Sequence, residues 1–75
     1  MIQCRLRELI AAQSRRERRR ITYQDILAAT GVNKNTLVRL ANDKMTMVGL
    51  SVVERLCAYF DCQPGDLFVY TRQEN

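Results

Sequence analysis

The sequence has no histidine and no tryptophan, and its 75 residues include one proline and three glycines. The three cysteines, Cys4, Cys57 and Cys62, contain no C-x-x-C pair, so a zinc site built from one chain would need carboxylate ligands. We therefore expect no metal and no cofactor, and we interpret the cysteines as core or partly buried thiols. Their odd number argues against a disulfide framework.

Other absences narrow the class of protein. No apolar run approaches the ~18–20 residues that cross a bilayer, and Arg5, Arg7 and Glu8 interrupt any signal peptide, which predicts a cytoplasmic protein without a membrane partner. There is no glycine-rich phosphate loop and no nucleophile–base pair, and Cys57 falls on the expected inner face of a helix. The sequence thus predicts neither an enzyme nor a small-molecule substrate.

What the chain does contain is a concentrated positive charge. At 47% hydrophobic and 27% charged residues, it predicts one globular domain over residues 1–75. Residues 1–20 hold seven arginines against two glutamates, a net +5, whereas residues 21–75 hold five basic and six acidic residues, a net −1. Five of the arginines lie in Arg15–Arg20. Such a patch is typical of a protein with a polyanionic partner, the alternative being a solvated face that aids solubility.

Two further helices are expected on either side of the central part of the chain. Helical spacing of Leu6, Leu9 and Ile10 predicts a helix over Ile2–Gln13 that extends into the arginine run, with the first three residues open to an extended form. A fourth helix is expected at 50–60, capped by Gly49 or by a Ser51-x-x-Glu54 box. Its buried face would carry Leu50, Val53, Leu56, Cys57 and Phe60.

The last part of the chain predicts a helical turn followed by a strand rather than a further long helix. Pro64 predicts one final helical turn, and residues 67–71 are rich enough in aromatic and β-branched side chains for a strand. Met45 and Met47 are interpreted as core filling rather than as an interaction surface. Phe68 and Tyr70 fit either closure of the core or a dimer edge.

Residues 22–42 carry the strongest pattern. Thr22 is a good N-cap for a helix at about 23–29 that would bury Ile26, Leu27 and Ala29. Gly31 is expected to adopt a left-handed turn. Asn33 then caps a helix at about 34–41 with Leu37 and Leu40 inside, and Val32 packs on Leu37. Two short helices hinged at a glycine, the second one opening in Asn-Lys-Asn-Thr, predict a helix-turn-helix.

Four short motifs, within residues 21–67, support a resemblance to a known family over more than nine-tenths of the chain. They are Ile21-Thr22, Thr30-Gly31-Val32, Thr36-Leu37-x-x-Leu40 and Leu56-Cys57-x-x-Phe60-x-Cys62-x-Pro-Gly-Asp-Leu67. From Met1 to about Tyr70 the chain resembles the Cro/repressor-type (XRE-like) helix-turn-helix transcription regulators, in particular a small stand-alone subgroup. The resemblance implies an all-α, compact five-helix lambda-repressor-like domain, with room for short terminal strands.

The resemblance also implies roles by position. The residues expected to contact base edges are Asn33, Lys34, Asn35 and Arg39. The residues expected to contact the DNA backbone are Thr22, Tyr23, Thr36, Asn42, Lys44, Arg15, Arg16, Arg18, Arg19 and Arg20. For Asn33 a purely capping role is the stronger alternative, and Tyr23 could simply pack over the start of its helix. Lys34 and Arg39 could be ordinary surface charges.

Two departures from the family pattern concern the second helix. Leu27 stands where the family prefers alanine, which should open or shift the helix crossing, and Tyr23 replaces the usual glutamine. The resemblance predicts a sequence-specific regulator of double-stranded DNA, most simply a repressor, that gains affinity as a homodimer. The alternatives are an antitoxin-like or adaptor module that binds another protein, and, third, an RNA-binding protein.

Overall fold

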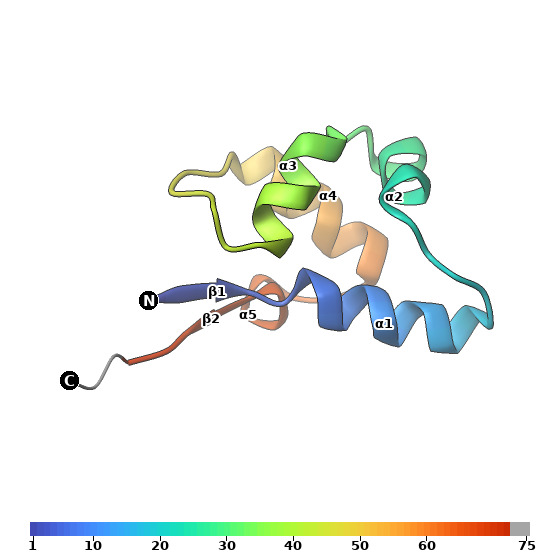
Figure 1. Ribbon diagram of the computed structural model, residues 1–75, viewed down its shortest axis with the longest axis horizontal. Helices are drawn as coiled ribbons and strands as arrows, with labels where there is room; N and C mark the ends of the chain where they lie inside the picture. The colour runs from blue at the N-terminus through green and yellow to red at the C-terminus, as the bar shows by residue number, and fades with distance from the viewer. Residues whose placement is uncertain (73–75) are drawn as a thin grey trace.

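The computed structural model describes residues 1–72, which form five helices and a two-stranded antiparallel sheet (Figure 1). The helices are α1 (Leu6–Glu17), α2 (Tyr23–Thr30), α3 (Lys34–Ala41), α4 (Leu50–Phe60) and α5 (Pro64–Leu67). The strands are β1 (Ile2–Cys4) and β2 (Phe68–Tyr70). The predicted five-helix fold with short terminal strands is therefore confirmed. None of the helices in residues 1–72 is both long and apolar enough to span a bilayer.

The beginning of the chain differs from the predicted helix. Residues 2–4 pair with β2 in the register Ile2↔Tyr70, Gln3↔Val69 and Cys4↔Phe68. The Cys4 N–H is also satisfied from outside the sheet, by Asp43 Oδ1 at 2.8 Å. These partners lie far along the chain, so no local pattern marks the strand. The helix starts instead at Leu6 and extends into the cluster of arginines at residues 15–20. It ends at Glu17, because Arg18 adopts a left-handed conformation with φ 54°.

A single core joins all five helices. Each helix contributes one side chain with no exposed surface: Leu6, Ile26, Leu37, Leu56 and Leu67. Ile21 and Val32 from the connections and Leu40, Ala41 and Phe60 from the helices complete the core. No charged or polar side chain is buried among the described residues. Burial of these apolar side chains is the main term that stabilises so small a domain.

Several predicted core positions lie at the surface instead. Ala29 is exposed and Leu27 only half-buried, because α2 turns Ile26 alone fully into the core. Leu50 is 85% exposed, since it is the first residue of α4 and lies beyond the packed part of that helix. Met47 is 83% exposed, whereas Met45 packs against the core as expected. The cap of α4 is Gly49.

Candidate nucleic-acid interface

The first helix of the helix-turn-helix is fixed at both ends. A capping box holds its start: Thr22 Oγ1 accepts the Asp25 N–H at 3.2 Å, and Asp25 Oδ2 accepts the Thr22 N–H at 2.9 Å. At the other end Gly31 has φ 76°, and its N–H donates to the Leu27 carbonyl at 2.8 Å. Both the N-cap and the left-handed glycine agree with the sequence prediction, so the turn into α3 has a defined direction.

The second helix begins with an asparagine cap. Asn33 Oδ1 accepts the Asn35 N–H at 2.7 Å, which supports the capping role considered for Asn33. Val32 and Leu37 are both buried in the core, as expected for a hydrophobic staple. The Asn33 side chain is exposed, but only its NH2 group remains free of this bond.

The solvent side of α3 is polar. Asn35 and Arg39 are exposed and lie four residues apart, so they share a face of the helix. That face is opposite Leu37 and Leu40, which are buried. Lys34 is exposed at the first turn, and Thr36 is half-buried on the side. The helix thus turns one amide and one guanidinium directly away from the core, the groups that bond adenine and guanine edges.

The residues expected to meet the DNA backbone lie at the ends of the two helices. The Thr22 hydroxyl is occupied in the capping box, and Tyr23 is half-buried against the core. Asn42 follows α3 and is exposed, and its Oδ1 accepts a hydrogen bond from Arg7 Nη2. The Lys44 side chain is exposed, while its N–H donates to the Arg39 carbonyl at 2.9 Å.

The structure separates the five clustered arginines into different environments. Arg19 is ion-paired with Glu17 at 3.0 Å and lies 3.6 Å from Asp25 Oδ2. Arg16 donates to the Gln13 side chain on α1. Arg15 is exposed on the last turns of α1, which form one extremity of the molecule in Figure 1, and Arg18 ends the helix there. The run is therefore not one uniform surface.

Arg20 occupies a different place from the other members of the run. It lines an open groove between α1 and the first turns of α2 and α3, together with Arg7, Ile10, Ile21, Thr22, Tyr23, Gln24 and Lys34. This groove contains three basic side chains and no carboxylate. Arg7 and Gln24 were not among the residues predicted from the sequence. Their position depends on how α1 packs beside α3, and no local motif encodes that contact.

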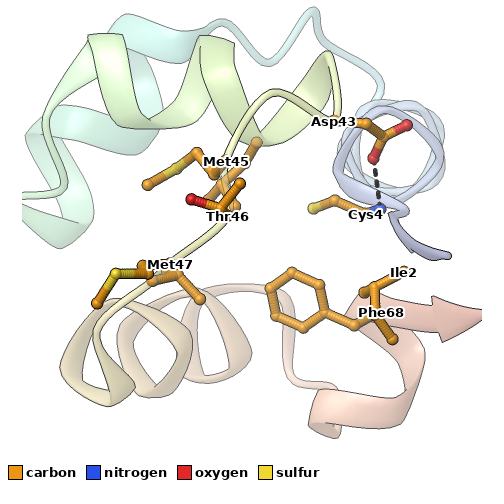
Figure 2. A pocket seen from close by; sticks show the side chains of 9 residues that line it. Ile2, Cys4, Asp43, Met45, Thr46, Met47 and Phe68 are labelled. Atoms are coloured by element: carbon orange, nitrogen blue, oxygen red, sulfur yellow. Dashed lines mark hydrogen bonds between the residues drawn. The ribbon is translucent and has the colours of Figure 1, made fainter.

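A second concave surface lies away from this groove and is mostly apolar (Figure 2). It is lined by Ile2, Cys4, Leu40, Asp43, Met45, Thr46, Met47, Val48 and Phe68. Its single carboxylate, Asp43, already accepts the Cys4 N–H. The exposed large hydrophobic side chains among residues 1–72 are Met1, Ile2, Met47, Leu50 and Tyr70. They lie in or beside β1 and β2, in the segment between α3 and α4, and at the first residue of α4.

The environment of the cysteines favours the thiol form at two of the three positions. All three are partly buried free thiols, as predicted. Burial raises the pKa of Cys4, and burial with the neighbouring Cys57 raises the pKa of Cys62 to about 11. These two thiols therefore stay protonated at neutral pH, the form that does not attack electrophiles. In residues 1–72 no three side chains of the types that bind metals come together.

Comparison with known proteins agrees with the geometry of α2 and α3. The family model of the Cro/C1-type HTH DNA-binding domain matches residues 5–73. The chain is also 29% identical over 58 residues to an uncharacterized HTH-type transcriptional regulator, YozG, of Bacillus subtilis strain 168, a match that covers 77% of this chain and 69% of the relative. No solved structure matches. The chain therefore belongs to the Cro/C1-type helix-turn-helix family, whose members bind DNA and are not enzymes.

Proposed function

We propose that this DNA-binding protein is a transcriptional repressor that occupies a specific operator, with α3 in the major groove of duplex DNA. The observation that carries the proposal is the exposed polar face of α3, with Asn35 and Arg39 turned away from the buried Leu37 and Leu40. A helix with such a face fits the width of the major groove. Because its ligand is DNA, the cytoplasm remains the expected place of action.

The side chains on this face suit distinct contacts. The Asn35 amide can bond adenine N6 and N7, and Arg39 can bond guanine O6 and N7. Asn33 retains an NH2 group for a base or a phosphate after capping the helix. Tyr23 and Thr36 lie in the first turns of α2 and α3, and Thr22, Asn42 and Lys44 lie just outside these helices. All five would meet the phosphates on either side of the groove.

We further propose that the protein binds its operator as a homodimer joined through the apolar surface of Figure 2. The hollow is lined by the highly exposed Met47, and the equally exposed Leu50 follows two residues after its lining residue Val48. Two copies can therefore each offer an apolar side chain to the hollow of the other across a two-fold axis. Its lining contributes one charge, Asp43, whereas the chain carries a net +4, mostly on residues 1–20. Contact here keeps the positive charges of two copies out of the interface.

The experiment is selection of bound duplexes from a random pool by the wild-type protein. A two-fold symmetric motif is expected, with half-sites about 10 base pairs apart. Asn35→Ala should lose discrimination at one position of each half-site, worth about 1–3 kcal/mol there. Glu54→Ala, at an exposed position of α4, is the matched control and should select the wild-type motif.

The outcomes separate the competing functions. Weak binding to every duplex at ~50 mM salt, with no enriched motif, would contradict the repressor proposal. An antitoxin-like or adaptor role would show instead as a stable complex with another protein that forms without DNA and is lost when the apolar surface is changed. Preferential binding of RNA over duplex DNA in direct competition would favour the third function.

A further inference from the structure

We infer that the groove between α1 and the first turns of α2 and α3 binds a single DNA phosphate, with Arg20 and Lys34 as its principal ligands. The inference rests on the proposed function and deepens it. It concerns the groove lined by Arg7, Arg20, Gln24 and Lys34, and it assigns to Arg20 a role that the other arginines of residues 15–20 do not share.

The charge of the groove fits an anion. Arg7, Arg20 and Lys34 bring three positive charges to one depression that has no carboxylate in its lining. The apolar part of the lining includes Ile10 and the buried Ile21. Because no carboxylate in the lining offsets them, these three positive charges together attract an anion more strongly than a single exposed cation would.

In the described part of the chain the Arg20 side chain is unpaired, like those of Arg15 and Arg18, but Arg20 is the member of the run that lines the groove. Within residues 1–72 it makes no hydrogen bond and no ion pair, whereas Arg19 is held by Glu17 and Asp25. A guanidinium matches the oxygens of a phosphate with two parallel N–H groups, and an ammonium adds a point charge. Arg20 and Lys34 thus supply complementary donors, and the Gln24 amide adds a neutral donor at the same groove.

The groove adjoins the residues that would contact bases. Lys34 is the first residue of α3 and directly precedes Asn35, so a phosphate bound by Lys34 fixes the position of that end of the helix along the DNA. Arg7 links the groove to the other end of α3 through its bond to Asn42 Oδ1. Because arginine only donates, this bond occupies the Asn42 oxygen and leaves its NH2 group to donate to a second phosphate.

The remaining arginines of the run then have a different role. Arg15, Arg16 and Arg18 lie on or just after the last turns of α1 and do not line the groove. Arg19 already stabilises the start of α2 through Asp25. These four residues contribute a diffuse positive field, which salt screens, rather than direct contacts with individual phosphates.

The test compares Arg20→Gln with Arg15→Gln, two variants that lose the same charge. Binding of a 20-base-pair random-sequence duplex is measured at several KCl concentrations. Arg20→Gln should weaken binding about tenfold and make the slope of log K against log salt shallower by about 0.9. Arg15→Gln should weaken binding less than about twofold and change the slope by much less than the Arg20 variant does.

Lys34→Gln supplies a second measurement, because two ligands of one phosphate are coupled. The double variant Arg20→Gln, Lys34→Gln should lose less affinity than the product of the two single losses. Equal losses for Arg15→Gln and Arg20→Gln, or fully independent losses at Arg20 and Lys34, would overturn the inference while leaving DNA binding intact. If the wild-type chain bound no duplex at low salt, the proposed function itself would fail.

Discussion

The conformation of Gly31 determines how α3 follows α2. Its φ of 76° is one that other residues adopt only at a cost, and a Cβ there would lie 3.6 Å from Arg55 Nη1, an ordinary contact. The penalty for Gly31→Ala is therefore conformational rather than steric. We expect the variant to lose about 1–2 kcal/mol of unfolding free energy, measured by urea denaturation.

Gly65 provides the matched control. It lies in α5 with φ outside the left-handed region, and a Cβ added there would meet no atom within 4 Å. Gly65→Ala should leave the stability unchanged or raise it by up to about 1 kcal/mol, because alanine restricts the unfolded chain. Equal destabilisation by the two substitutions would contradict a special role for the Gly31 backbone.

At the scale of the element, the start of α2 depends on a carboxylate. Hydrogen bonds from the Thr22 backbone and side chain, with nearby Arg19, hold the pKa of Asp25 below its ordinary value of 3.8. A group with a lowered folded-state pKa stabilises the protein above its unfolded pKa and loses that contribution as the pH falls through the folded one. The urea midpoint should therefore decrease as the pH falls below about 4.

The variant Asp25→Asn separates this cap from the other acidic groups. It should lower the urea midpoint at pH 7 and reduce the further loss of stability in acid. Glu54→Gln is the control, because Glu54 makes no hydrogen bond or ion pair within residues 1–72, and it should keep the full acid dependence of the wild type. An acid dependence unchanged in Asp25→Asn would show that other carboxylates, such as Glu17, dominate it.

Elements with local signals were predictable from the sequence. The caps Thr22 and Asn33 and the glycine at 31 fixed α2 to within a residue and α3 at both ends, and the apolar spacing located α4 at 50–60. The sequence left the first three residues open to an extended form and indicated a strand at residues 67–71. The pairing of Ile2–Cys4 with Phe68–Tyr70 was not predictable, because the two segments lie at opposite ends of the chain.

The residues of the candidate interface likewise fall into those that the sequence could indicate and those that only the tertiary structure reveals. The polar face of α3 follows from helical periodicity, whereas the expected roles of Asn35 and Arg39 on that face came from the family resemblance. Arg7 could not, because its contact with Asn42 requires α1 to pack beside α3. The distinct environments of Arg19 and Arg20 also depend on tertiary structure, although the two residues are adjacent in the sequence.

At the scale of the whole molecule, basic and apolar surfaces are separated along a body of 41 × 24 × 19 Å. In Figure 1 the strands and the segment between α3 and α4 lie toward one end, and the last turn of α1 lies at the other. A single small module buries little DNA surface, so affinity for an operator gains from a second copy. Joining two copies at the apolar end leaves both basic ends free for DNA.

Leu50→Glu tests this arrangement without disturbing the fold. Leu50 is 85% exposed and is the first residue of α4, where an acidic side chain is favourable to the helix. We expect the variant to keep its unfolding free energy but to sediment as a monomer at concentrations where the wild type is a dimer. Ala11→Glu introduces the same charge at an exposed position of α1 and should remain dimeric. A wild type that stays monomeric with and without operator DNA would contradict the dimer, and equal dissociation of both variants would move the interface away from Leu50.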